Sequence, residues 1–244
     1  MIGMDQFRRR WALGRVALVL FCSSSALAQQ GALTRGDATV AIEPFAPNIV
    51  RITLSLDRNA ALQPPGVGII AGPAQGDWSH SDGNGGDVYR SSRLVVHVSP
   101  ASHGKAGGTQ SDIARYFNGS TPYVGIRIET AAGKDILSMR DWEMAVPNYK
   151  DGNADILHDR RPSDPPFFEV GATFASPDDE HYYGLGQNQQ GFLDLRNHSL
   201  QCEHDYNAAA GPSVCVPFVV TNKGYALLWD NPSKTRVDFG FNGQ

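Results

Sequence analysis

Residues 214–229 read VCVPFVVTNKGYALLW, two apolar runs separated by the polar tetrapeptide at 221–224. Short runs rich in valine, phenylalanine, tyrosine and tryptophan on either side of an asparagine- and glycine-containing turn are typical of a β-hairpin. The segment therefore predicts two antiparallel strands, over residues 214–220 and 225–229.

The same kind of pattern recurs in earlier parts of the chain. Apolar and polar residues alternate in short segments bounded by turn residues, at 39–42, 49–54, 93–98, 123–128, 136–139 and 167–174. Helical periodicity is limited to about two turns over 111–117. The glycine- and serine-rich segments 71–86 and 101–110 are expected to be solvated loops. Many short antiparallel strands joined by turns predict an all-β fold, an antiparallel β-sandwich.

The composition supports this fold and excludes several classes of protein. The 244 residues include 26 glycines and 15 prolines, above their usual combined share of roughly 12%. This excess favours a turn-rich β fold over a helical bundle. A net charge of −4 argues against a nucleic-acid-binding protein. Three cysteines are too few for a disulfide scaffold or a multi-site zinc protein.

The N-terminus has the features of a secretory signal peptide. Three arginines at 8–10 precede the short apolar run 16–22, and Ala26-Leu27-Ala28 provides small residues before a cleavage point after Ala28. The alternative is an amphipathic helix packed on the fold. We expect residues 1–28 to be removed, residues 29–36 to form a short disordered lead, and the protein to be periplasmic or secreted.

Removal of the signal peptide makes the chain more acidic. Residues 1–28 carry four arginines and one aspartate. The acidic chain that remains would be repelled by phosphate backbones and anionic membranes, so we expect neither nucleic acid nor membrane as a partner. A neutral ligand is compatible with this charge.

Two cysteines, Cys202 and Cys215, remain after signal cleavage. In an oxidising compartment their spacing favours a disulfide. The alternative is a metal site in which Cys202, His204 and Cys215 supply three ligands, but zinc sites usually contain paired spacings such as Cys-x-x-Cys, which the sequence lacks. The disulfide is therefore the preferred prediction, and no metal is expected.

Common catalytic signatures are missing from the sequence. It contains no Gly-x-Ser-x-Gly elbow, no Walker loop and no His-Glu-x-x-His motif. The glycines at 184, 186 and 191 have the wrong spacing for a dinucleotide loop. Carboxylates cluster at 178–180, directly after Pro177, where a solvated turn is the preferred interpretation. No cofactor is implied.

The segment at 203–207 is the best candidate for ligand binding. Glu203-His204-Asp205-Tyr206-Asn207 places an acid, an imidazole, a phenol and an amide within five residues. Dense polar groups beside an aromatic ring suit hydrogen bonding to sugar hydroxyls. A polar loop without a ligand is an equally good interpretation of these residues alone.

A series of segments in the second half of the chain resembles a known family. In order, they are Tyr182-Tyr183-Gly184-Leu185-Gly186-Gln187, Asp194-Leu195-Arg196, His204-Asp205, Val216-Pro217-Phe218-Val219 and Gly224-Tyr225-Ala226-Leu227-Leu228-Trp229-Asp230-Asn231-Pro232. Their order and spacing resemble the N-terminal β-sandwich of glycoside hydrolase family 31, which includes α-glucosidases and α-xylosidases. Residues 37–56 resemble the opening of that domain.

The resemblance implies a galactose-mutarotase-like sandwich over residues 37–244, beside a (β/α)8 catalytic barrel. In the family, the loop at about 201–211 reaches the mouth of the barrel, and an aspartate on it binds substrate hydroxyls. Asp205 occupies the matching position, and His204 beside it is the second candidate. The chain has Cys202-Glu203-His204-Asp205 where Trp-Asn-x-Asp is commoner, a difference that bears on the sugar preferred.

The resemblance assigns no catalytic residue to this chain. In the family both catalytic carboxylates lie in the barrel, downstream of the segments quoted, and no residue here matches either. We therefore expect the chain to be inactive alone, and its sandwich to be incomplete after Phe239.

The implied function is that of an N-terminal domain fragment of a secreted α-glycosidase, which hydrolyses α-linked glycosides with retention. Its partner would be an α-linked oligosaccharide or glycoside, bound through the barrel. The alternative is a stand-alone carbohydrate-binding or mutarotase-like sandwich. Such a sandwich would use a histidine and a glutamate as acid and base, and His97, His181, His198 and His204 keep that alternative open.

Overall fold

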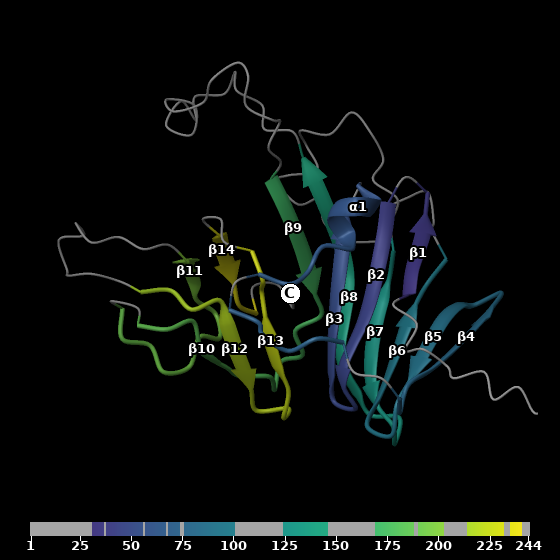
Figure 1. Cartoon of the computed structure of the whole chain (residues 1–244). Coiled ribbons are helices and arrows are strands. Elements are labelled where there is room, and N and C mark those ends of the chain that lie inside the picture. Colours follow the sequence, from purple (N-terminus) through teal and green to yellow (C-terminus); the bar gives the residue numbers. More distant parts are fainter. Residues whose placement is uncertain are drawn as a thin grey trace, which may run out of the picture.

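In the computed structural model, the residues described are 31–36, 38–55, 57–66, 68–73, 76–100, 124–145, 169–187, 190–202, 214–231 and 235–240. They form antiparallel sheets and one four-residue helix (Figure 1). The predicted all-β fold is confirmed. No helix in these ranges has the length and apolar character needed to cross a membrane.

The first layer is a three-stranded antiparallel sheet of β1 (Gly31–Arg35), β2 (Ala38–Ala46) and β3 (Ile49–Ser55). Ile42 lies opposite Ile52, and the strands predicted at 39–42 and 49–54 are confirmed. The helix α1 (Arg58–Ala61) follows β3, and the Asp57 side chain accepts a hydrogen bond from the backbone nitrogen of Asn59 at 2.7 Å.

The second layer is a six-stranded antiparallel sheet in which the strands follow chain order. The strands are β4 (Ser79–Gly83), β5 (Gly86–Arg90), β6 (Leu94–Val98), β7 (Ile126–Thr130), β8 (Asp135–Ala145) and β9 (Glu169–Phe174). Strands predicted at 93–98, 123–128, 136–139 and 167–174 are confirmed, with shifts at their ends. The two layers lie face to face on the right of Figure 1.

The main hydrophobic core fills the space between these layers. Alternate residues of each strand point inward, because successive side chains of a strand lie on opposite faces. The buried members are Ala38, Val40, Ile42, Tyr89, Val96, Val98, Val124, Ile126, Met139 and Trp142. The opposite face of β6 and β7 carries the polar residues His97, Arg127 and Glu129 together with the buried Val95.

Two sequence-based expectations about this sandwich need correction. The sequence predicts a disordered lead over residues 29–36, but Gly31–Arg35 form β1, paired along its length with β2. It predicts a loop over residues 71–86, but Ser79–Gly83 form the edge strand β4. All five residues of β4 are exposed, and such a strand has no apolar alternation to reveal it. The segments 101–110 and 111–117 lie outside the described residues.

A smaller unit follows β9 in the chain and lies on the left of Figure 1. It combines a three-stranded sheet, in the order β10 (Tyr182–Gly184), β12 (Phe218–Thr221), β13 (Ala226–Leu228), with the pair β11 (Ser199–Cys202) and β14 (Thr235–Asp238). A second core holds the unit together and comprises Tyr182, Leu185, Leu195, Leu200, Val219 and Phe239.

The hairpin predicted at 214–229 is the centre of this unit. Phe218 lies opposite Leu228, and Gly224 adopts the positive φ of 87° that its turn requires. The prediction is confirmed, although β12 begins at Phe218 and the preceding residues make only a single bridge, between Val214 and Gln187.

Candidate functional site

The predicted ligand-binding residues His204 and Asp205 lie outside the described residues. The structure does describe both ends of the segment that carries them. On one side, β11 ends at Cys202; on the other, Val214 precedes β12. The site can therefore be characterised by the elements that anchor this segment.

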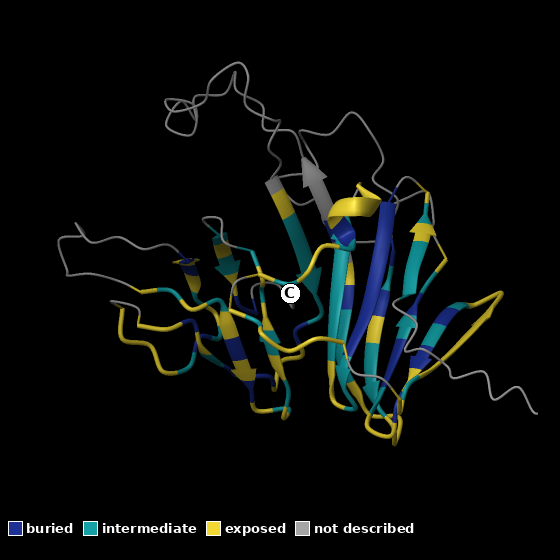
Figure 2. Ribbon diagram, viewed as in Figure 1, coloured by how far each residue is buried: buried dark blue, intermediate teal, exposed yellow. Residues whose placement is uncertain are grey.

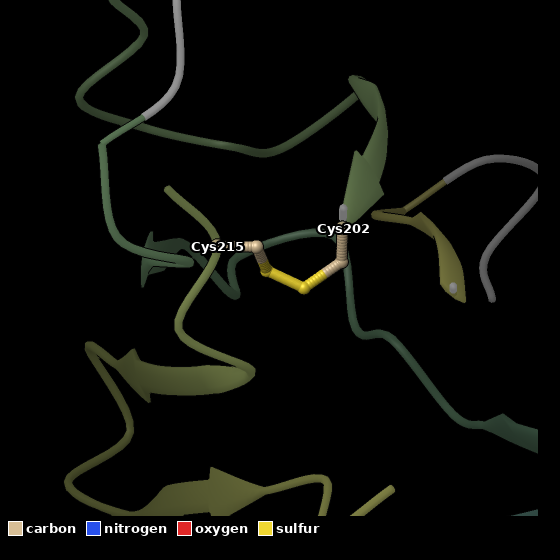
Figure 3. The surroundings of a disulfide bond; sticks show 2 residues. All are labelled: Cys202 and Cys215. Atoms are coloured by element: carbon tan, nitrogen blue, oxygen red, sulfur yellow. A yellow bond between two sulfur atoms is a disulfide. The ribbon is translucent and has the colours of Figure 1, made fainter. Parts of the chain in front are cut away.

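A disulfide joins Cys202 to Cys215 at the base of the segment (Figure 3). The two Cα atoms are 5.1 Å apart, across a sequence separation of 13. Both sulfurs are used in the bond, so neither cysteine is a thiolate ligand in this state. A loop of this size is constrained by about 3 kcal/mol of chain entropy, which fixes the points where the segment leaves and re-enters the sheet.

Arg196 connects the segment before β11 to the turn before β10. Its Nη1 atom donates to the backbone carbonyl oxygens of Glu180 at 2.7 Å and of Pro177 at 2.8 Å. The backbone nitrogen of Arg196 donates to Asp194 Oδ1 at 3.0 Å. The segment before β11 is thereby attached to the turn before β10.

Glu180 is a buried carboxylate inside that unit, with 1% of its surface exposed. Burial raises the pKa of Tyr225, and a hydrogen bond to Glu180 raises it further. Burial also raises the pKa of Tyr182, whose hydroxyl donates to Ser176 Oγ at 2.6 Å. The Oε1 atom of Glu180 has no hydrogen-bond partner within the part of the chain that the structure describes.

The solvated turn predicted at 178–180 is therefore wrong for one residue. Asp178 and Asp179 are exposed, but Glu180 points inward. The turn closes with a hydrogen bond from the backbone nitrogen of Glu180 to the carbonyl oxygen of Pro177 at 3.0 Å. Because the turn closes in this way, the side chain of Glu180 points toward the core. Three consecutive acidic residues do not predict that one of them is buried.

The hairpin turn at 221–224 also contacts the acidic turn at 178–180. Lys223 forms an ion pair with Asp179 and donates a hydrogen bond to it. That hydrogen bond lowers the pKa of the Asp179 carboxyl below its usual value. Asn222 donates from Nδ2 to the carbonyl oxygen of Asp179 at 2.9 Å and accepts from the backbone nitrogen of His181 at 2.9 Å. The turn at 221–224 therefore stabilises the acidic turn at 178–180 that precedes β10.

An aromatic pair lies shortly before β11. The rings of Phe192 and His198 are stacked, with centroids 3.6 Å apart and planes 11° apart. Phe192 and its neighbour Leu193 are exposed. The sequence does not single out either of these two apolar residues, because an isolated aromatic residue in a polar segment carries no periodic signal.

Three of the four histidines considered for a mutarotase-like site contact other side chains of the described residues. His97 Nε2 lies 3.0 Å from Glu129 Oε1, and this hydrogen bond lowers the pKa of Glu129. His181 Nδ1 lies 2.5 Å from Asp194 Oδ2, and His198 stacks on Phe192. The fourth, His204, lies outside the described residues.

Comparison with known proteins identifies the family to which the chain belongs. The model of the glycosyl hydrolase 31 N-terminal galactose mutarotase-like domain matches residues 39–238. That match covers most of the sandwich and the smaller unit. The chain belongs to glycoside hydrolase family 31.

Parts of individual family 31 proteins are similar to this chain. An uncharacterized family 31 glucosidase of Pseudescherichia vulneris is 36% identical over 75 residues, which are 31% of this chain and 13% of that protein. The family 31 α-xylosidase of Xanthomonas citri superposes with a TM-score of 0.60 at 22% identity, covering 86% of this chain and 19% of that one. A Flavobacterium johnsoniae family 31 dextranase gives 0.55 at 14% identity, covering 84% and 21%. The chain spans about a fifth of these two solved relatives.

Proposed function

We propose that this chain is the N-terminal sandwich domain of a secreted α-glycosidase and that it forms part of the wall of that enzyme's active site. The observation that carries the proposal is the match of residues 39–238 to the family 31 N-terminal domain. The complete enzyme hydrolyses α-linked glycosides with retention, through a covalent glycosyl-enzyme intermediate. Neither catalytic carboxylate is assigned to this chain.

The contribution of this domain to the active site comes from the disulfide-anchored segment. Asp205 binds sugar hydroxyls through charge-assisted hydrogen bonds, and His204 supports it as a second polar contact. The Cys202–Cys215 bond limits the conformations open to the segment, so less entropy is lost when a sugar binds. The ligand is an α-linked oligosaccharide or a simpler α-glycoside, and no cofactor is needed.

The cellular location follows from the N-terminal segment. We propose that residues 1–28 direct export and are cleaved after Ala28, so that the protein works in the periplasm or outside the cell. The disulfide is consistent with an oxidising compartment. N-terminal sequencing of the exported protein is expected to start at Gln29; an intact N-terminus on exported protein would contradict the cleavage.

The function is tested by joining the 244-residue chain to the catalytic part of the Xanthomonas citri α-xylosidase, in place of that enzyme's own N-terminal domain. The chimera is assayed on aryl α-xyloside and aryl α-glucoside, beside the catalytic part alone and the chain alone. We expect the chimera to be faster than the catalytic part by about tenfold or more, because groups that hold a substrate in its reactive position contribute at least this much to the rate.

Two results would contradict the proposal. One is a chimera no faster than the catalytic part alone, which means that the chain adds nothing to the site. The other is release of sugar by the purified chain alone, which places catalytic groups within it. Retention is checked separately by NMR, in which the α-anomer of the sugar appears first; first appearance of the β-anomer shows inversion.

A further inference from the structure

An Asn-Gly pair forms the turn at the tip of the hairpin of β4 and β5. Asn84 and Gly85 are the two residues between these strands, and Gly83, the last residue of β4, lies opposite Gly86, the first residue of β5. Asn84 and Gly85 are both exposed, as is every residue of β4, at the right-hand edge of the fold in Figure 2. The tip of this hairpin is therefore open to water.

The backbone nitrogen of Gly85 is available for reaction. In the ranges that the structure describes, no group accepts a hydrogen bond from it. A Cβ atom added to Gly85 would meet no other atom within 4 Å, so nothing crowds this nitrogen or prevents the turn from moving. Glycine also lacks the side chain that limits rotation about its own backbone bonds. The nitrogen can therefore approach the side chain of the preceding residue, Asn84.

Asn84 is the only asparagine within the described ranges that is followed by glycine. Asn197 is followed by histidine and Asn222 by lysine, and these side chains hinder the approach of the backbone nitrogen. The Asn222 amide is also held in place, because its nitrogen and its oxygen each make a hydrogen bond of 2.9 Å. Asn118 and Asn242, which glycine also follows, lie outside the described residues.

From these observations we infer that the Asn84-Gly85 turn is a site of spontaneous covalent modification, at which Asn84 is converted to aspartate and isoaspartate. The inference is independent of the proposed function. The backbone nitrogen of Gly85 bonds to the Cγ atom of Asn84, and the side-chain amide leaves as ammonia together with the proton that the nitrogen loses. The product is a cyclic succinimide.

Water then opens this ring in either of two ways. Addition at Cγ breaks the bond between Cγ and the nitrogen of Gly85, which leaves an ordinary aspartate. Addition at the backbone carbonyl carbon of residue 84 breaks the bond between that carbon and the nitrogen, and the main chain then passes through the former side chain, as isoaspartate. Both products carry a negative charge that Asn84 lacks, and neither step needs an oxidant, a reductant or a cofactor.

Isoaspartate separates the edge strand β4 from the sheet. The main chain gains an extra carbon atom at the turn, so the register that places Asp82 opposite Asp87 is no longer matched. The new carboxylate also lies near these two, and like charges on facing strands repel. Little opposes the separation, because β4 is the last strand of its sheet and all its residues are exposed. The 2.6 Å contact between His80 and Asp87 is lost with it.

The test follows Asn84 chemically in the 244-residue chain. The folded protein is kept in warm, mildly alkaline buffer, samples are digested, and mass spectrometry measures the fraction of each asparagine converted to an acid. Electron-transfer fragmentation separates aspartate from isoaspartate, and a protein isoaspartyl methyltransferase with labelled S-adenosylmethionine counts isoaspartate independently. The variants are Gly85→Ala and Asn84→Gln. Alanine fits at position 85, because Gly85 lies outside the left-handed region and a Cβ there meets open space.

We expect Asn84 to be converted at least about tenfold faster in the parent than in Gly85→Ala, because a Cβ on residue 85 hinders the attack. Within the parent, Asn197 and Asn222 are converted more slowly than Asn84 for the same reason. Asn84→Gln removes the isoaspartate signal from this peptide, because the longer side chain would have to close a larger ring. Aspartate and isoaspartate appear together, since both come from one succinimide.

Three results would overturn the inference. The first is conversion of Asn84 that is no faster than that of Asn197 or Asn222. The second is an equal rate in the parent and in Gly85→Ala, which means that the nitrogen of residue 85 is not the attacking group. The third is aspartate without isoaspartate, which shows direct hydrolysis of the side-chain amide.

Hydrogen exchange measures the effect on β4. The isoaspartate form is separated by chromatography, and the backbone amides of residues 79–83 are expected to exchange at least about tenfold faster than in the parent, because the strand opens locally. Asn84→Asp is the matched control, since it carries the same charge on an ordinary main chain. Exchange no faster in the isoaspartate form than in Asn84→Asp refutes the separation of β4 by the altered main chain.

Discussion

Arg196 and Glu180 are joined by a hydrogen bond from Nη1 of the guanidinium to the backbone carbonyl oxygen, 2.7 Å long. The same nitrogen also reaches the carbonyl of Pro177 at 2.8 Å. One side chain thus satisfies two backbone acceptors of the turn that leads into β10. The guanidinium is largely buried, so these bonds are not easily replaced by water.

Replacement of Arg196 is expected to destabilise the smaller unit. Arg196→Leu removes charge-assisted hydrogen bonds and leaves two carbonyls without their donor, which lowers the free energy of unfolding by about 2–3 kcal/mol. Urea denaturation measures the change. The control is Arg236→Leu, which removes an exposed arginine of β14 paired with Asp238, and a loss equal to that of Arg196→Leu would refute the role of the buried contacts.

Opening the disulfide is expected to weaken the same unit. The double variant Cys202→Ser, Cys215→Ser lowers the free energy of unfolding by about 2–4 kcal/mol, mainly because the unfolded chain regains freedom. Thermal denaturation of the oxidised protein with and without reductant gives an independent value. If reductant leaves the melting temperature of the wild type unchanged, the bond does not stabilise the fold.

Tyr89 is expected to titrate well above an ordinary tyrosine. Burial raises its pKa to about 12 from the usual 10.0. The neutral hydroxyl is thus favoured in the folded state, and the associated stability is complete below pH 10 and is lost as the pH rises toward 12. Tyrosinate absorbance shows whether the step near pH 12 disappears in Tyr89→Phe.

The same substitution is expected to stabilise the fold at neutral pH. The Tyr89 hydroxyl is buried and has no hydrogen-bond partner among the described residues, so its removal relieves a desolvation penalty and raises the free energy of unfolding by about 1–3 kcal/mol. Tyr182→Phe is the matched comparison, because it removes the bond to Ser176 and costs about 1 kcal/mol. Equal effects of the two variants would contradict this difference.

Asp87 is expected to make the stability of the folded state depend on pH in the acid range. Burial alone would raise its pKa, but hydrogen bonds from Arg35 and His80 and their charges outweigh burial and hold it below the usual 3.8. The carboxylate therefore stabilises the folded state above that pH, and the contribution is lost as the pH falls through the lowered value.

Asp87→Asn tests this linkage because it removes the ionisable group. We expect the variant to be less stable than the wild type at neutral pH and the gap between them to narrow as the pH falls below 3.8. Urea denaturation over that range measures the gap. A gap that stays constant would show that the ion pair to Arg35 does not contribute to acid sensitivity.

Asp205 is expected to affect catalysis in the chimera without affecting the fold. Asp205→Ala removes charge-assisted hydrogen bonds worth about 1.5–3 kcal/mol, which appears as a higher KM or a lower kcat/KM. The reference variant is Asp82→Ala, which removes an exposed carboxylate of β4, in the other part of the fold. Unchanged kinetics of Asp205→Ala on short and long substrates would remove Asp205 from the site.

The strands with strong alternation could be predicted from residues alone. In β2, β3, β6 and β7, apolar residues recur at alternate positions and pack in the main core, because successive side chains of a strand lie on opposite faces. The hairpin of β12 and β13 is predicted by residues that are close together in the sequence, a turn between two apolar runs. The resemblance to family 31 also rests on short local segments, and the family match over 39–238 confirms it.

Other features depended on which neighbours the fold brings together. The strand β1 is held by pairing with β2 and by the ion pair of Arg35 with Asp87, 52 residues away in sequence. The edge strand β4 exists because β5 pairs with it, and no apolar pattern marks it. These two strands have weak local preferences, so long-range hydrogen bonds decide their conformation.

The burial of Glu180 and the exposure of Val216 and Val220 show the same distinction for single side chains. Sequence identifies a residue as polar or apolar, but solvent exposure depends on what covers it in three dimensions. An acidic residue at the end of a polar run lies in the core, while alternate valines of an apolar run face solvent. Periodicity gives the two faces of a strand, and only tertiary packing decides which face is covered.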